Sequence, residues 1–178
     1  GIVFNGKEYE VDCIIFATGF EVGTEYSRRA GYQIHGVDGK TVTQKWQNGL
    51  ATFHGMHSRG FPNAFFFGPA QSGFTATYTY SLDEQSIHLA YILEKIIDKG
   101  ATRVEASQEA EEQWIQTIIE KARLTADFQE NCTPGYYNNE GKINQTPQNN
   151  TYGGGPIEFF SLMKKWRSKD NLEGLEIN

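Results

Sequence analysis

One short apolar run sets the main limits on the fold. Residues Ala64 to Phe67 are four consecutive apolar residues without polar alternation, a pattern typical of a strand buried on both faces in a parallel sheet. Turn formers bound the run, with Pro62 before it and Gly68 after it. We therefore predict a strand, a glycine turn and a helix whose N-terminus faces a ligand. An ordinary strand-to-helix connection within a core is the alternative.

Three later stretches predict helices. From about Ser81 apolar residues recur at near-helical spacing up to a stop at Gly100. Ser107 can cap a second helix, and Pro156 suits the first position of a third. The stripes that we expect to be buried are Ala110, Trp114, Ile118 and Ala122 in the second helix, and Ile157, Phe160 and either Met163 or Lys164 in the third. We interpret the acidic group Glu109, Glu111 and Glu112 as a solvated first turn.

The remaining segments are predicted to be strands, connectors and a tail. Asn5-Gly6 is the preferred turn of a type I′ hairpin, so the chain opens in a β-hairpin. Residues Cys13 to Ala17 predict a second buried strand. We expect Trp46 to sit in a core near a small helix, residues 101–105 to be a connector, and the polar tail from Ser168 to fray.

Composition excludes several classes of function. The net charge is -6 and the basic residues form no stripe, which argues against nucleic-acid binding. No run of about 18 apolar residues is present, so we expect no membrane partner. Cys13 and Cys132 lie far apart in sequence, which favours a reducing, cytoplasmic compartment. His54 and His57 have helical spacing, but Gly55 disfavours a helix, so we predict no metal site.

Four segments, taken in order, resemble the C-terminal third of type I Baeyer–Villiger monooxygenases, which are flavin enzymes with FAD and NADPH sites. The segments are residues 12–20, 60–69, 132–142 and 152–160. The last two resemble the branch that acts on bulky cyclic ketones, including steroids. The resemblance implies an α/β fold class: the C-terminal portion of a Rossmann-like flavoprotein with two dinucleotide-binding domains, made of short strands followed by helices and a long loop.

The resemblance also implies a division of the chain. Residues 1–20 would end the NADP-binding domain, residues 21–130 would belong to the FAD-binding domain, residues 131–151 would form a mobile lid loop, and residues 152–178 would form a C-terminal helix and tail. The chain contains no Gly-x-Gly-x-x-Gly fingerprint, whereas the family has two. We therefore expect a chain that starts inside a larger fold, is inactive alone, and lacks its N-terminal FAD and NADP domains. Apolar faces left exposed would favour a homo-oligomer.

The resemblance implies site residues but no catalytic residue and no metal ligand. Those expected to contact FAD or NADPH are Ala17, Thr18, Gly19, Gly68, Pro69, Gln71, Thr75 and Thr133. Those expected to border the ketone are Phe74, Tyr78 and Tyr136. Many family members carry a tryptophan where Thr133 stands here, so that contact differs.

The implied reaction is reduction of the flavin by NADPH, addition of O₂, and insertion of one oxygen atom beside a ketone carbonyl to give an ester or lactone. One alternative is a flavin monooxygenase that oxidises nitrogen or sulfur and shares the Ala17-Thr18-Gly19 element. Another is a non-catalytic binding or structural module. The glycine-rich segment 152–156 and the paired tyrosines at 136 and 137 favour the Baeyer–Villiger reading.

Overall fold

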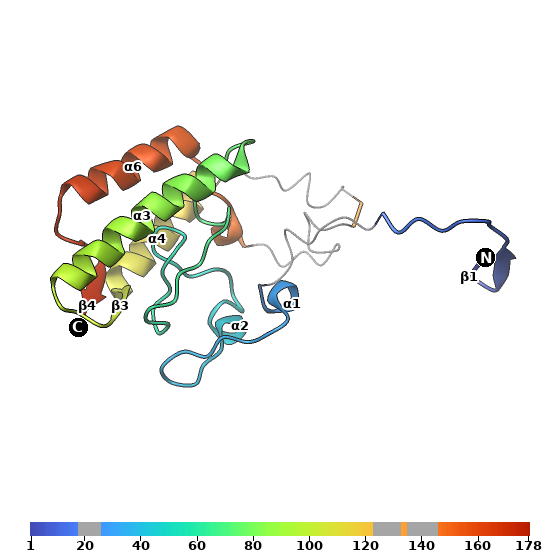
Figure 1. The fold of residues 1–178 in the computed structure, drawn as a ribbon, viewed down its shortest axis with the longest axis horizontal. Coiled ribbons are helices and arrows are strands. Elements are labelled where there is room, and N and C mark those ends of the chain that lie inside the picture. The colour runs from blue at the N-terminus through green and yellow to red at the C-terminus, as the bar shows by residue number, and fades with distance from the viewer. Residues whose placement is uncertain (18–25, 123–132, 135–145) are drawn as a thin grey trace.

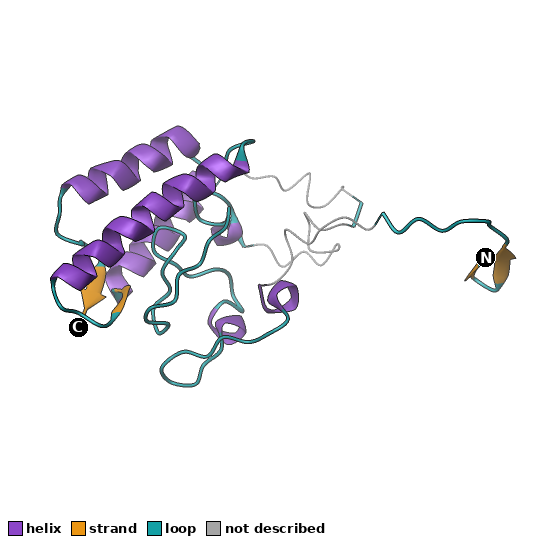
Figure 2. Ribbon diagram, viewed as in Figure 1, coloured by secondary structure: helices purple, strands orange, loops and turns teal. Residues whose placement is uncertain are grey.

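The computed structural model describes residues 1–17, 26–122, 133–134 and 146–178. A body of three longer helices carries short strands and loops at its edges, and an N-terminal arm lies apart from it (Figures 1 and 2). The elements in chain order are β1 (Ile2–Phe4), β2 (Lys7–Tyr9), α1 (Tyr26–Ala30), α2 (Val42–Lys45), α3 (Tyr78–Asp98), β3 (Val104–Ala106), α4 (Gln108–Lys121), the 3₁₀ helix η2 (Pro147–Asn149), α6 (Pro156–Ser168) and β4 (Leu175–Ile177). Within the described ranges, no helix combines the length and apolar content that crossing a membrane requires.

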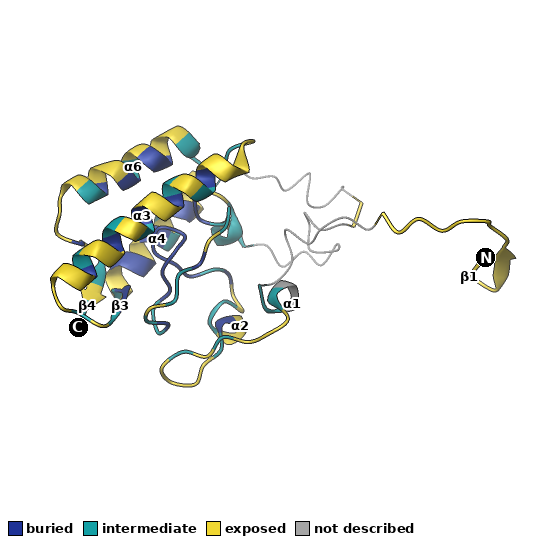
Figure 3. Ribbon diagram, viewed as in Figure 1, coloured by how far each residue is buried: buried dark blue, intermediate teal, exposed yellow. Residues whose placement is uncertain are grey.

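The larger core lies between α3, α4 and α6. Figure 3 shows that the buried positions of these helices face inward. Ile92 and Ile118 are fully buried, and aromatic side chains fill much of the remaining space, with the Trp114 and Tyr152 rings stacked at 5.7 Å. Large flat side chains remove much apolar surface from water, so this cluster is the main source of stability.

The helix predictions are confirmed, with three corrections to their faces. Ala122 lies just beyond α4 as its C-cap and is only partly buried. Ser107 caps α4 by accepting a hydrogen bond from the Ala110 N–H, as predicted. Glu111 is not solvated: it is 5% exposed, because the 58–60 segment covers it and bonds to its carboxylate. In α6 the predicted Ile157 is 83% exposed, because the buried face runs through Phe159, Phe160, Met163 and Trp166 instead.

A two-stranded antiparallel ribbon closes the end of the body. β3 pairs with β4 in a register that places Val104 opposite Ile177. Two predictions are therefore wrong, since residues 101–105 are not a plain connector and the tail does not fray. Leu172, which is 3% exposed, packs into the larger core, and the backbone oxygen of Asn178 accepts from Thr102 at 2.7 Å. Apolar burial and strand pairing together hold the tail in place.

A smaller core lies beside α1 and α2. It contains Val42, Phe61 and Phe66, with Trp46 packed against it as predicted. The predicted strand over residues 64–67 is wrong: the run makes one isolated bridge, between Phe65 and His57. The reason is that its side chains separate, with Phe66 in the smaller core, Phe65 against the larger core and Phe67 37% exposed.

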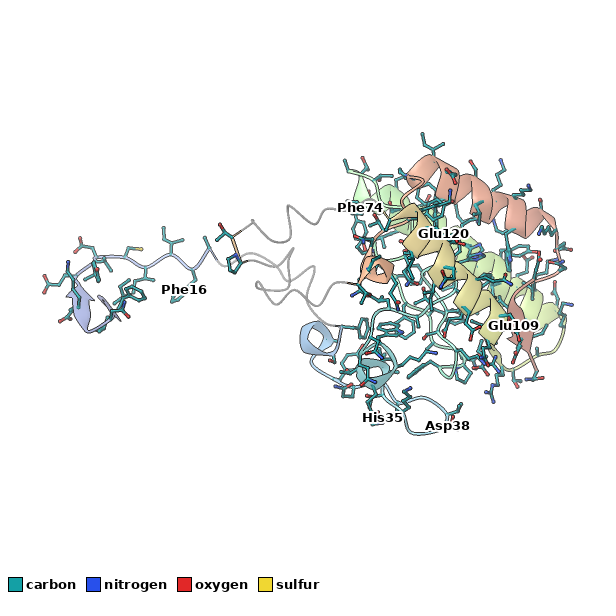
Figure 4. The ribbon with its side chains drawn as sticks, turned by 180° about the vertical axis from the view of Figure 1, so that it is seen from behind. Phe16, His35, Asp38, Phe74, Glu109 and Glu120 are labelled. Atoms are coloured by element: carbon teal, nitrogen blue, oxygen red, sulfur yellow. The ribbon has the colours of Figure 1, made fainter. Side chains whose placement is uncertain are left out.

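The N-terminal hairpin is confirmed. Ile2 pairs with Tyr9, and both turn residues have positive φ, 50° at Asn5 and 75° at Gly6. The buried strand predicted over residues 13–17 is wrong, because no described residue covers this stretch, and Phe16, labelled on the arm in Figure 4, is 84% exposed.

Candidate functional site

The 67–78 segment links the smaller core to α3 and runs along the first turns of that helix. The Gln85 side chain donates to the Gly68 carbonyl at 3.0 Å, and the Ser81 hydroxyl accepts from the Thr75 N–H at 3.2 Å. The helix predicted from about Ser81 begins at Tyr78, and its first turns lie against the Gly68 turn through the Gln85 bond. The positive φ of 55° at Gln71 is incompatible with a continuing right-handed helix.

One side of this segment is open and partly aromatic. Phe67, Phe74 and Tyr78 are 37%, 48% and 38% exposed, and the Phe74 and Tyr78 rings lie 5.8 Å apart. A Cβ placed on Gly68 would meet no atom within 4 Å. Figure 4 shows Phe74 at the edge of the body, beside the N-terminal end of α3. The segment therefore offers an apolar surface with open space beside it.

The other side of the segment is fixed by buried hydrogen bonds. Gln71 and Ser72 are both 0% exposed. The Ser72 hydroxyl donates to the Gly68 carbonyl at 2.5 Å, and the Ser72 carbonyl accepts from the Tyr152 N–H at 3.0 Å. Gly73 passes so close to Phe159 that an added Cβ would lie 2.8 Å from its ring. The backbone under the open surface therefore has little freedom to move.

The segment also presents backbone donors. Phe74 and Ala76 are exposed residues, and among the described residues no acceptor pairs with their backbone N–H groups. Donors of this kind, next to the N-terminal end of α3, can bind a carbonyl or anionic oxygen.

The predicted site residues separate into three groups. Gly68, Pro69, Phe74, Thr75 and Tyr78 lie on this segment with Gln71, whose side chain is turned inward. Ala17 is exposed on the arm, and Thr133 is exposed in a short described stretch. Thr18, Gly19 and Tyr136 lie outside the described residues.

Sequence reasoning missed a cluster of three buried histidines in the larger core. His54, His57 and His88 are 4%, 2% and 2% exposed, and the rings of His54 and His88 lie 5.4 Å apart. Burial lowers the pKa of His57 to about 4 and that of His88 to about 3. Across the described residues these side chains form no group suited to a metal ion. The spacing of His54 and His57 was a signal, but His88 comes from α3 and could not be placed beside them.

Two buried carboxylates were also missed. Glu111 bonds to Lys45 at 2.6 Å and accepts from the Arg59 N–H at 2.7 Å. Glu105 accepts from the Gly60 N–H at 2.9 Å. Burial opposes ionisation of Glu105, yet this bond and the Arg103 guanidinium lower its pKa overall. These carboxylates line a polar hollow and fix the 58–60 backbone.

Several known proteins are similar to this chain in sequence. No protein-family model matches the chain. It is 44% identical over 180 residues to pentalenolactone D synthase of Streptomyces exfoliatus, with 99% of this chain and 31% of the relative covered. It is 39% identical over 180 residues to a Baeyer–Villiger monooxygenase of Stachybotrys chlorohalonatus, with 100% of this chain and 29% of the relative covered. The chain therefore spans about 30% of these relatives.

Solved structures also resemble this chain. The polycyclic ketone monooxygenase of Thermothelomyces thermophila superimposes with a TM-score of 0.78 at 32% identity, covering 86% of this chain and 25% of that one. The OTEMO complex with FAD and NADP superimposes with a TM-score of 0.67 at 25% identity, covering 97% of this chain and 31% of that one. The α/β fold class is thereby confirmed.

Proposed function

The chain corresponds to a C-terminal part of the Baeyer–Villiger monooxygenases, and on that premise we propose that it supplies one wall of the flavin and ketone site of an FAD- and NADPH-dependent monooxygenase. The enzyme as a whole would insert one oxygen atom beside a ketone carbonyl and release an ester or lactone. The observation that carries this proposal is the 67–78 segment, which is open and apolar on one side and fixed by buried hydrogen bonds on the other.

The residues of this segment fit a flat cofactor. Gly68 has no side chain and open space beside it, so a planar ring system can approach the backbone there. The backbone N–H groups of the exposed residues Phe74 and Ala76 can donate to ring oxygens. When bound, the flavin would supply the redox chemistry and the activation of O₂. We propose that Gly68, Pro69 and Thr75 hold its edge, and that Ala17, Thr18, Gly19 and Thr133 contact the cofactors from the other segments.

The aromatic pair Phe74 and Tyr78 would border the ketone. Their rings lie 5.8 Å apart and each residue is more than a third exposed, so they present an apolar surface that a bulky ketone can cover. Covering them expels water, which protects the reacting atoms from side reactions. The 67–78 segment contains no Asp, Glu, His, Lys or Cys, so we propose that its share of catalysis is to bind the cofactor and the ketone, to orient them and to exclude water. Tyr136 remains part of the proposed ketone border.

We propose the following division of labour within the enzyme. Residues 1–20 would lead out of the NADP-binding domain, residues 21–130 would complete the FAD-binding domain, residues 131–151 would cover the site, and residues 152–178 would seal it. The chain alone would be inactive, and the partners it requires are the FAD and NADP domains, a small-molecule ketone and O₂. A cytoplasmic compartment and a homo-oligomer remain proposals of the same kind.

A chimera tests this function. We would replace the corresponding part of pentalenolactone D synthase of Streptomyces exfoliatus, at 44% identity, with this chain. The expected result is a yellow, NADPH-reducible protein that converts a cyclic ketone into its lactone, while the isolated chain is colourless. Oxidation of a sulfide or amine without any lactone would instead favour a nitrogen- or sulfur-oxidising enzyme. A folded chimera without flavin would favour a non-catalytic module.

A matched pair of variants tests the ketone border. Phe74→Ala should raise the KM for a bulky ketone while flavin binding stays unchanged, because the ring bounds the substrate and not the cofactor. Tyr32→Ala removes another exposed aromatic, 58% accessible and outside the 67–78 segment, and should leave KM unaltered. Equal effects of the two changes would contradict the assignment of Phe74.

A further inference from the structure

Gln71 occupies an unusual position at the centre of the 67–78 segment. Its side chain is 0% exposed, and both polar atoms of its amide are hydrogen-bonded. The amide nitrogen donates to the carbonyls of Leu50 at 2.7 Å and Gln148 at 2.8 Å. The amide oxygen accepts from the Thr52 hydroxyl at 2.5 Å. No polar atom of this side chain is left for a cofactor or substrate.

The backbone of Gln71 is engaged as well. Its N–H donates to the Asn150 carbonyl at 2.8 Å, and its own carbonyl accepts from the indole N–H of Trp114 at 3.2 Å. Gly55 lies against the same carbonyl, where an added Cβ would sit 2.9 Å away. One residue thus joins four parts of the chain: residues 50–52, residues 148–150, α4 and the 67–78 segment.

These bonds connect stretches that are distant in sequence. The partners of the Gln71 amide nitrogen are separated from it by 21 and 77 residues, and the indole of Trp114 by 43. Buried hydrogen bonds of this kind specify one arrangement, because breaking any of them leaves a donor or acceptor without a partner and without water. Gln71 therefore determines where the segment lies relative to residues 146–152.

The position of Gln71 links this anchor to the open surface. It stands midway between Gly68 and Phe74, and the neighbouring Ser72 bonds directly to the Gly68 carbonyl. A shift at Gln71 would therefore move both the glycine proposed to face the flavin and the ring proposed to face the ketone. Misplacement of about 1 Å at such a surface is enough to cost a large factor in rate.

We propose that Gln71 is a positioning residue, one that touches neither flavin nor ketone but fixes the distance between the surfaces that bind them. This inference rests on the proposed function for its catalytic consequence, but the anchoring itself is a property of this chain alone. When the anchor is lost, the enzyme should still consume NADPH and O₂ but form less ester from the ketone. NADPH consumption and ester formation should therefore separate.

The first experiment measures amide hydrogen exchange in the 178-residue chain. Gln71→Met keeps the length of the side chain and the same backbone requirement at positive φ, so it removes only the polar bonds. The amides of Thr75 and Tyr152 should exchange about ten- to a hundredfold faster than in the parent, in line with the loss of buried hydrogen bonds. The amide of Ile118 in α4, which reports on the core, should change much less.

Two further variants keep the experiment decisive. Thr52→Val removes only the bond to the Gln71 oxygen, so it gives a milder form of the same pattern should Gln71→Met fail to fold. Ile96→Val is the control, because it removes one methyl group from the larger core near the other end of α3, where Ile96 is 7% exposed. It should speed amide exchange no more in the 67–78 segment than elsewhere in the chain. Uniform acceleration in all three variants, or no acceleration at Thr75 and Tyr152, would overturn the anchoring role.

The second experiment uses the chimera. Gln71→Met should lower the ester formed per NADPH consumed severalfold, with hydrogen peroxide making up the difference, whereas Ile96→Val should lower the thermal midpoint and leave that ratio unchanged. An unchanged ratio in Gln71→Met would overturn the catalytic consequence. A chimera that binds no flavin would count against the proposed function, and the exchange pattern in the isolated chain would still decide whether Gln71 is the anchor.

Discussion

Acidification should destabilise this protein through its three buried histidines. Burial is the first cause of the low pKa of each: about 4 at His57, about 3 at His88, and well below the usual range at His54, where the charges of His88 and His57 add to the effect. Arg167, whose Nη1 lies 3.4 Å from His88 Nδ1, further opposes protonation of His88. The folded state therefore holds these rings neutral.

The sign and size follow from proton binding. In the unfolded chain a histidine has an ordinary pKa of 6.5, so below that pH the unfolded state binds more protons than the folded state. The contribution of the neutral histidines to the free energy of unfolding is therefore fully present above pH 6.5, and it is lost as the pH falls toward their folded-state pKa values. At about 1.4 kcal/mol per pH unit, His57 and His88 each cost about 2 kcal/mol at pH 5. Their combined cost, about 4 kcal/mol, is a large share of a typical domain stability.

Urea unfolding at several pH values measures this loss. Between about pH 7.5 and pH 5 the free energy of unfolding should fall by on the order of 4 kcal/mol or more, and its slope against pH should correspond to about two to three protons. His88→Gln keeps a hydrogen-bonding side chain but cannot be protonated, so it should remove about one proton from that slope.

The control is an exposed histidine. His35→Asn removes a ring that lies on a loop at the surface, as labelled in Figure 4, and should leave the pH dependence of the parent intact. A free energy of unfolding that stays constant from about pH 7.5 to pH 5 would refute the reasoning. So would a slope that His35→Asn reduces as much as His88→Gln does.

Three further predictions concern single side chains. Gly68→Ala should change the free energy of unfolding by less than about 0.5 kcal/mol in urea, since its Cβ meets nothing, yet it should weaken flavin binding in the chimera; tight binding would contradict the proposed contact. Gly153→Ala should destabilise the chain by several kcal/mol or prevent folding, because its Cβ would collide with the Lys121 carbonyl, and a normal thermal midpoint would contradict this. Glu111→Gln should lower the free energy of unfolding by about 1–3 kcal/mol, because it leaves Lys45, 22% exposed, without its carboxylate partner. Thermal unfolding in low and high salt measures this loss, and an unchanged midpoint would count against the pairing.

Local signals predicted the helices and the hairpin correctly because those elements depend on neighbouring residues. Asn5 and Gly6 determine a tight turn, and Ser107 determines where α4 begins, whatever surrounds them. The resemblance to Baeyer–Villiger monooxygenases could be recognised because several segments matched in order along the chain, and the comparisons with known proteins confirmed it.

Features that depend on distant partners could not be predicted in this way. The run Ala64–Phe67 has the composition of a buried strand, but its rings are divided between two cores that the sequence does not reveal. Glu111 has the pattern of a solvated first turn, but Arg59 and Lys45 meet it from elsewhere in the chain. In the candidate site, the place of Gly68 and Phe74 on one segment could be predicted from the resemblance; the structure leaves Gly68 partly buried and Phe74 exposed. The inward direction of Gln71 could not, since its partners lie 21 and 77 residues away.

The separation of the aromatic residues into two clusters gives the protein two optical reporters. Trp46 belongs to the smaller cluster, where its ring lies 4.8 Å from that of Phe66, whereas Trp114 and Trp166 belong to the larger. These are all three of its tryptophans. Emission from a Trp46→Phe protein would therefore follow melting of the helical body alone, and the difference from the parent spectrum would follow the loops around α1 and α2. Whether the two halves melt together can thus be read without any added label.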